Sequence, residues 1–98
     1  MWNGNKKMNE NYIDKIERIL ASKIKVDKPL MNLYVLLVLV KGTKVTLEDV
    51  HTAWASDKNM SCKEHYSLKP FSKLTKEMQD KDLEYVNAIR ETAKKCLE

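Results

Sequence analysis

A glutamate, a histidine and a tryptophan follow one another at intervals of three residues in the middle of the chain, as Glu48-x-x-His51-x-x-Trp54. On a helix these side chains are neighbours, because residues three or four apart share a face. A histidine beside a carboxylate and an indole can hydrogen-bond, exchange a proton near neutral pH, or help hold a planar ligand. The same spacing also fits a buried histidine that bonds a backbone carbonyl while the tryptophan fills the core. The residue types alone favour this second, structural interpretation.

A second group of reactive side chains follows in the segment 60–74, where Cys62 and His65 lie three residues apart. Zinc ligands use this spacing, but the other candidate ligands, His51 and Cys96, are remote in sequence. A Cys–His nucleophile would need a third group to orient the histidine, and none is evident. The chain also lacks the P-loop, GxGxxG, HExxH and CxxC motifs. We therefore predict no metal, no cofactor and no enzymatic activity.

Composition restricts the class of protein further. The 98 residues are enough for one domain, and a net charge of +4 is a mild basic excess. This excess lies mainly in residues 1–28 and 59–74, where it could attract phosphates but also suits an ordinary solvated surface. Two cysteines and no apolar leader predict a reducing, cytoplasmic location. Two glycines and two prolines are too few for a turn-rich β-sandwich.

The densest apolar run, Pro29 to Val40, is the element around which the rest should pack. It is too short to span a bilayer, which takes about 20 residues, so we predict no membrane insertion. Its valines would also suit a strand, but the proline at its start and Gly42 just past its end favour a helix. A helix that is apolar all round belongs in a core. We therefore expect four of its side chains to be among the most buried: Leu33, Leu36, Leu37 and Val40.

The remaining pattern predicts an all-α fold, a compact bundle of about four helices around this central apolar helix. Apolar residues recur at helical spacing, and Asp27, Thr46 and Thr75 can cap the starts of helices. The predicted helices cover residues 9–24, 29–41, 46–58 and 75–96. Residues 60–74 form one irregular loop, residues 1–8 a flexible leader, and residues 9–98 a single domain.

Taken together, three blocks of residues resemble the RyR domain. These blocks are Glu48-x-x-His51-x-x-Trp54-Ala55, His65-x-x-Leu68-x-Pro70-Phe71-x-x-Leu74, and Asp82 early in the last helix. The RyR domain is the small helical repeat module of ryanodine receptors, which also occurs as stand-alone bacterial and phage proteins. The resemblance covers residues 46–90. Phe71 replaces the usual tyrosine, Tyr66 replaces a proline, and the family's Gly-Trp-x-Tyr-Gly segment has no counterpart here.

The resemblance implies a non-enzymatic binding module for a nucleotide-derived signalling ligand, such as a phage or bacterial anti-defence protein that sequesters an immune messenger. Trp54 and Tyr66 would stack a base, the two histidines would donate hydrogen bonds, and nearby lysines would face phosphates. We further expect Trp54, His51 and His65 to converge. The predicted ligand-binding residues are Glu48, His51, Trp54, Lys58, Lys63, His65, Tyr66 and Lys69.

The alternative is a protein–protein interaction module, an inhibitor or adaptor with no small-molecule ligand. We do not expect nucleic acid as a partner, because the helix 46–58 carries Glu48, Asp49 and Asp57 against Lys58, the wrong charge for a major-groove reader. The chain has more apolar surface than four helices easily hide, so we also predict a homo-oligomer.

Overall fold

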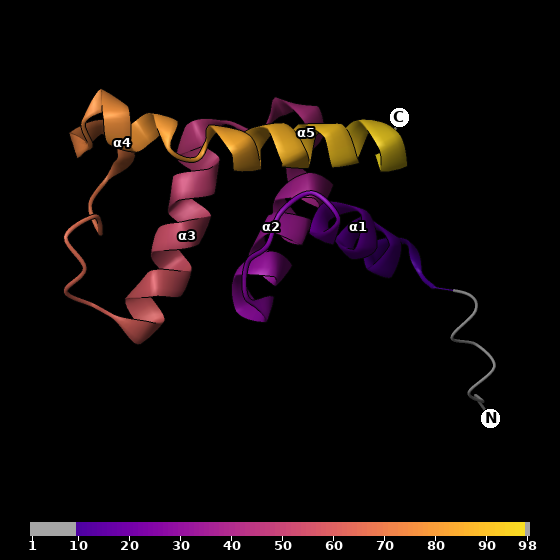
Figure 1. Ribbon diagram of the computed structural model, residues 1–98, viewed down its shortest axis with the longest axis horizontal. Helices are drawn as coiled ribbons and strands as arrows, with labels where there is room; N and C mark the ends of the chain where they lie inside the picture. Colours follow the sequence, from indigo (N-terminus) through magenta and orange to yellow (C-terminus); the bar gives the residue numbers. More distant parts are fainter. Residues whose placement is uncertain (1–9, 98) are drawn as a thin grey trace.

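The computed structural model describes residues 10–97, and over this range the chain is built from helices and connecting turns without a strand (Figure 1). The predicted all-α bundle is therefore confirmed. The expected flexible leader, residues 1–8, lies outside the described residues. The α-helices are α1 Tyr12–Ala21, α2 Lys28–Val40, α3 Leu47–Ser61, α4 Lys76–Asp80 and α5 Leu83–Leu97, and the 3-10 turns are η2 Gly42–Lys44 and η3 Phe71–Lys73.

Short polar side chains fix where the helices begin. The Asp27 carboxylate accepts the Leu30 N–H at 3.3 Å at the start of α2, and the Thr75 hydroxyl accepts the Met78 N–H at 3.2 Å at the start of α4. At α3 the capping box is complete. The Thr46 hydroxyl accepts the Asp49 N–H at 3.1 Å, and the Asp49 carboxylate accepts the Thr46 N–H at 2.9 Å. These bonds satisfy N–H groups that have no partner within a helix, and they confirm the three predicted caps.

The connection from α2 to α3 is tied to α5. Gly42 has a φ of 58°, a conformation that glycine adopts without steric cost, and it turns the chain into η2. Val45, which follows η2, is fully buried, and its carbonyl accepts two hydrogen bonds from the Arg90 guanidinium of α5, at 2.9 and 3.2 Å. This contact helps to hold α5 in place relative to the start of α3.

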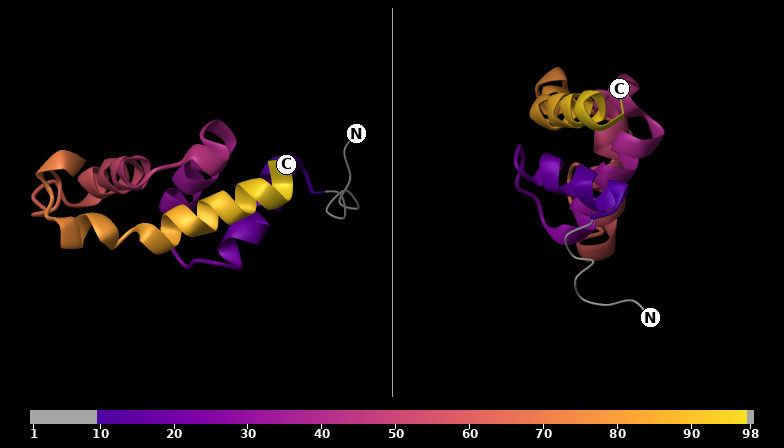
Figure 2. Two further views of the ribbon diagram at one scale, coloured as in Figure 1. Left: turned by 90° about the horizontal axis from the view of Figure 1, so that it is seen from above. Right: turned by 90° about the vertical axis from the view of Figure 1, so that its right-hand side faces the viewer.

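Helices α2 and α5 together form the centre of the bundle, because α2 packs against α1, α3 and α5, and α5 packs against α1, α2 and α3. Figure 1 shows α5 crossing the upper ends of α2 and α3, and Figure 2 shows that α4 and its preceding loop lie at the opposite end of the molecule from α1. Within the described residues, no helix has the length and apolar character needed to cross a membrane. The largest fully buried side chains come from every one of the four long helices and include Ile16, Leu20, Tyr34, Val38, Val50 and Ile89.

The predicted buried face of α2 is wrong. Leu36 is 51% exposed and Val40 is 64% exposed, while Leu33 and Leu37 are only partly buried. A helix that is apolar on all sides carries no pattern that says which side faces inward, so the neighbouring helices decide. They cover one side and leave the other open to solvent. The side that they cover consists of Leu30, Met31, Tyr34, Val35 and Val38.

The helix expected over residues 75–96 is divided into α4 and α5 by a turn at Lys81 and Asp82. The Asp82 carbonyl accepts the N–H groups of Tyr85 at 3.0 Å and Val86 at 3.1 Å, which begins the new helix. The irregular loop predicted at 60–74 is present, except that α3 continues to Ser61 and η3 forms a single turn within the loop. The break brings Asp82 to the start of α5.

Two valines on α2 test the orientation of this helix. Val38 is fully buried, so Val38→Ala should reduce the free energy of unfolding by about 2–3 kcal/mol, through two lost methyl groups and the cavity they leave. Val40→Ala makes the same chemical change on the exposed side and should alter stability by less than about 0.5 kcal/mol. Urea denaturation of both variants measures the difference. Equal losses would contradict the observed orientation.

Candidate functional site

His51 and Trp54 of α3 converge with His65 of the following loop, as the sequence predicts. The His51 and Trp54 rings lie 5.7 Å apart between centroids, and the Trp54 and His65 rings lie 5.1 Å apart in an edge-on arrangement. Tyr66 stacks on His65 at 4.6 Å. His51 and Trp54, on one face of α3, and His65 and Tyr66, adjacent in the loop, therefore form one continuous aromatic cluster.

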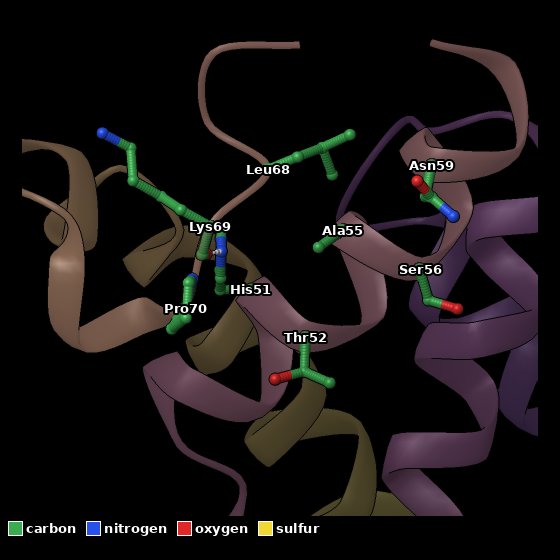
Figure 3. A pocket seen from close by; sticks show the side chains of 8 residues that line it. All are labelled: His51, Thr52, Ala55, Ser56, Asn59, Leu68, Lys69 and Pro70. Atoms are coloured by element: carbon green, nitrogen blue, oxygen red, sulfur yellow. Dashed lines mark hydrogen bonds between the residues drawn. The ribbon is translucent and has the colours of Figure 1, made fainter. Parts of the chain in front are cut away.

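His51 has a structural role in this cluster. Its side chain is 5% exposed, and Nε2 lies 2.8 Å from the Lys69 backbone carbonyl (Figure 3). Because a carbonyl only accepts hydrogen bonds, Nε2 must carry the proton and donate it. This bond joins α3 to the loop, as in the structural interpretation of the sequence pattern. Glu48 is exposed and forms no hydrogen bond with His51, although the spacing of the two residues would have allowed one.

His65 keeps one donor free. Its Nδ1 accepts the backbone N–H of Ser67 at 3.0 Å, so the proton of the neutral ring resides on Nε2. Protonation of Nδ1 would break this bond. His65 can therefore offer a ligand one N–H group without becoming charged.

Two adjoining hollows lie beside the aromatic cluster and share Trp54, Lys81 and Asp82. We call them together the Trp54–Asp82 groove. The hollow on the loop side has a volume of about 200 Å³ and is lined by His51, Trp54, His65, Tyr66, Ser67, Met78, Lys81 and Asp82. The hollow on the α2 side has a volume of about 410 Å³ and is lined by Leu30, Tyr34, Trp54, Lys81, Asp82, Glu84 and Tyr85. The volume of the α2-side hollow by itself is within the range found for small-molecule sites.

Asp82 is the most unusual group in the groove. Burial raises the pKa of its carboxyl above the ordinary value of 3.8, and the nearby His51 offsets only part of that effect. The same carboxylate contributes to the raised pKa values of Tyr34 and Tyr85, for which burial is the main cause. Within residues 10–97 the Asp82 side chain has neither a hydrogen-bond nor an ion-pair partner. A half-buried carboxylate without a partner destabilises the fold, and such groups concentrate at binding sites.

The lysines around the groove differ from those expected. Lys58 belongs to the last turn of α3, and Lys63 is exposed in the loop, but neither lines the groove. Lys69 supplies the carbonyl that holds His51, while its side chain extends away from α3 (Figure 3). Lys81 lines both hollows instead. The groove therefore contains one lysine with two carboxylates and is not a basic pocket.

Sequence reasoning did not place Lys81, Glu84, Tyr34 and Tyr85 in the site. No local pattern distinguishes them, because they reach the groove through the packing of α2 against α5 and through the break before α5. The sequence did draw attention to Asp82, because this residue is part of the three blocks that resemble the RyR domain.

A separate open hollow of about 390 Å³ lies between α3 and residues 68–70 (Figure 3). Its lining combines the small side chains of α3 with Leu68 and Pro70. The Lys69 ammonium points away from it, and apart from the edge of His51 it lacks an aromatic surface. The Trp54–Asp82 groove is therefore the better candidate for a specific ligand.

Neither histidine nor cysteine residues build a metal centre in the part of the chain that the structure describes. No group of three or more His, Cys, Asp and Glu side chains lies close enough there to hold an ion. Cys62 is exposed, Cys96 is half-buried, and both are free thiols.

Comparison with known proteins identifies one family. A family model described as a domain of unknown function, DUF7701, matches residues 7–94, which is most of the chain. No curated protein and no solved structure matches the chain significantly.

The carboxyl of Asp82 predicts a pH-dependent stability. The pKa of this carboxyl is higher in the folded than in the unfolded chain. Its ionisation therefore destabilises the fold as the pH rises from the unfolded-chain pKa through the folded-chain pKa. Asp82→Asn should therefore raise the melting temperature at pH 7, and the gain should disappear as the pH falls to below 3.8. Melting curves of both proteins between pH 3 and pH 7 measure this. A variant that is less stable than the natural protein at pH 7 would contradict it.

Proposed function

We propose that this chain, which belongs to the family of the domain of unknown function DUF7701, is a non-enzymatic module that binds a nucleotide-derived signalling ligand. The observation that carries the proposal is the position of Trp54. Its half-exposed indole lines both hollows of the Trp54–Asp82 groove, where hydrogen-bonding groups flank it. An aromatic surface with a few convergent polar groups is the usual composition of a small-molecule site.

A planar base is the part of a nucleotide that Trp54 and Tyr66 would hold. Tyr66 is 72% exposed and lines the loop-side hollow with Trp54. Stacking of a base on an aromatic side chain contributes about 1–3 kcal/mol to binding. Both rings pack against His65, at 5.1 and 4.6 Å between centroids, and line the same hollow, so one ligand can reach both.

The polar donors on the loop side suit phosphate oxygens. His65 offers its Nε2–H, because Nδ1 already accepts from Ser67, and Lys81 lines the same hollow. Lys58, Lys63 and Lys69 do not line the groove, so we assign them long-range attraction of an anionic ligand. That contribution should weaken with added salt.

Binding without turnover fits the state of the two histidines. One ring nitrogen of each is already engaged by the protein, His51 Nε2 with Lys69 and His65 Nδ1 with Ser67. Neither is paired with a nucleophile, as covalent catalysis by a histidine-activated side chain would require. The RyR resemblance supports the same conclusion and the sequestration of an immune messenger by a phage or bacterial protein. We further propose that the protein acts in the cytoplasm, since its free thiols suit a reducing compartment.

Two exposed tyrosines form a matched test of this function. Tyr66 is 72% exposed in the groove and Tyr12 is 66% exposed on α1, so replacing either with alanine should leave the melting temperature nearly unchanged. A thermal-shift screen of the natural protein against cyclic dinucleotides and ADP-ribose derivatives would identify a ligand. Tyr66→Ala should then weaken binding by about 1–3 kcal/mol in calorimetry, while Tyr12→Ala should leave it unchanged.

The results of these measurements distinguish ligand binding in the groove from the alternative function, a protein–protein interaction module. Equal affinities for the Tyr66→Ala and natural proteins would remove Tyr66 from the site. If no ligand of the panel raised the melting temperature, the proposal would fail, and a protein–protein interaction module would become the better explanation.

We also propose that the chain self-associates through the open side of α2. Leu36 and Val40 are each more than half exposed there, beside the partly buried Leu33 and Leu37. Contiguous apolar side chains of this kind mark interaction surfaces more often than free surface. The same side of α2 would serve an inhibitor or adaptor that docks a partner.

Light scattering tests self-association. The natural protein at tens of micromolar should have a mass above the 11.4 kDa of one chain. Leu36→Lys should reduce that mass to the monomer value, whereas Leu83→Lys, on α5 and similarly exposed at 49% against 51%, should not. A natural protein that is already monomeric would contradict the proposal.

A further inference from the structure

Asp82 lies where the two hollows of the Trp54–Asp82 groove meet. It lines both of them, as do Trp54 and Lys81. Its carboxylate is partly removed from water and has no hydrogen-bond or ion-pair partner among residues 10–97. The backbone carbonyl of Asp82 is occupied by the first turn of α5, so the side chain is the group free to contact a ligand.

An ionised carboxylate only accepts hydrogen bonds, and its two oxygens can accept two parallel donors. Of the common bases, guanine presents such a pair, the N1–H beside the N2 amino group. Adenine and cytosine place one amino group next to an acceptor nitrogen, which would repel the second carboxylate oxygen. Uracil and thymine have one N–H between two carbonyls. The carboxylate therefore matches the donor edge of guanine.

We propose that the Trp54–Asp82 groove selects guanine nucleotides, with Asp82 accepting the N1–H and N2–H of a base stacked against Trp54. This inference rests on the proposed function and deepens it by naming the base. Asp82 would be the residue that determines specificity, and Trp54 would supply affinity that does not depend on the base.

The charged and polar side chains of the two hollows indicate how the ligand would be oriented in the groove. The α2-side hollow has a second carboxylate, that of Glu84, which suits a donor-rich base. The loop-side hollow has the free Nε2–H of His65 and the hydroxyl-bearing ring of Tyr66, and Lys81 lines both hollows. The donor edge of the base, stacked on Trp54 and Tyr66, accordingly faces Asp82 and Glu84, and the phosphate lies toward Lys81 and the Nε2–H of His65.

The α2 side of the groove is held in place by the core. Tyr85 is half-buried and lies 5.6 Å from the Tyr34 ring, which is 1% exposed. A wall anchored in this way keeps its shape before the ligand arrives, and preorganisation of this kind reduces the free-energy cost of binding. It also keeps Asp82 at a fixed depth beside the indole.

The test compares three mononucleotides by calorimetry with the full 98-residue chain at one ionic strength. GMP should bind more tightly than AMP and IMP, and IMP differs from GMP only by lacking the N2 amino group. A bidentate contact discriminates by about 1–3 kcal/mol, so we expect a preference of roughly 5- to 150-fold over AMP and a smaller one over IMP.

Asp82→Asn assigns the preference to one side chain. An amide has a single acceptor and directs N–H donors at the N2 amino group, so the variant should bind GMP no more tightly than IMP. The fold of the variant is checked by its melting temperature. The control is Asp80→Asn, which removes an exposed carboxylate of α4 that is paired with Lys76 at 2.9 Å and does not line the groove. It should retain the preference for GMP.

Three results would overturn the inference. If GMP, IMP and AMP bound equally, or Asp82→Asn kept the preference for GMP, the guanine assignment would be wrong while nucleotide binding stood. If none of the three bound but tetramethylammonium raised the melting temperature of the natural protein and not of Asp82→Asn, the groove would be an aromatic cation site. In that case the proposed function would be wrong as well.

Discussion

The hydrogen bond from His51 Nε2 to the Lys69 carbonyl, 2.8 Å long, is the contact on which the candidate site depends. The loop after α3 is also held by the buried Ser67 and Leu74 and by the Gln79 side chain, which donates to the Phe71 and Leu74 carbonyls at 3.0 and 3.3 Å. The His51 side chain is buried, so losing this bond would leave its Nε2–H unsatisfied away from water, which destabilises the fold. It therefore fixes the loop against α3 and, with it, the position of His65 beside Trp54.

This bond also changes the role of the residue that the sequence makes most conspicuous. His51 occupies the centre of the Glu48-x-x-His51-x-x-Trp54 pattern, yet its Nε2 serves the fold and its ring is almost fully covered. The groups that would face the proposed ligand are its neighbours, Trp54 by its partly exposed indole and His65 by its remaining N–H. A histidine in such a pattern can thus build a site without contacting the ligand.

Local rules were sufficient for much of the fold. The caps at Asp27, Thr46 and Thr75 and the shared face of His51 and Trp54 follow from spacing alone, because they involve residues close in sequence. The expected convergence with His65 rested instead on one core holding both α3 and the loop. What the sequence could not provide depends on packing between distant segments. The inward side of α2 is set by its neighbours, and the break before α5 that brings Asp82 and Tyr85 to the groove has no glycine or proline to mark it.

If the groove binds the proposed nucleotide, its electrostatics favour recognition by shape and hydrogen bonding over attraction by net charge. The chain has a net charge of +4, but Lys58, Lys63 and Lys69 do not line the groove, whereas Asp82 does. If anion attraction were the only requirement, a carboxylate at the junction of the two hollows would oppose it, and burial makes that carboxylate unfavourable for the fold too. A ligand with neutral donors and a separate anionic end would offset both effects, the repulsion of an anion by Asp82 and the burial of an unpaired carboxylate. Its donors satisfy the carboxylate, and its anionic end lies toward Lys81 and His65.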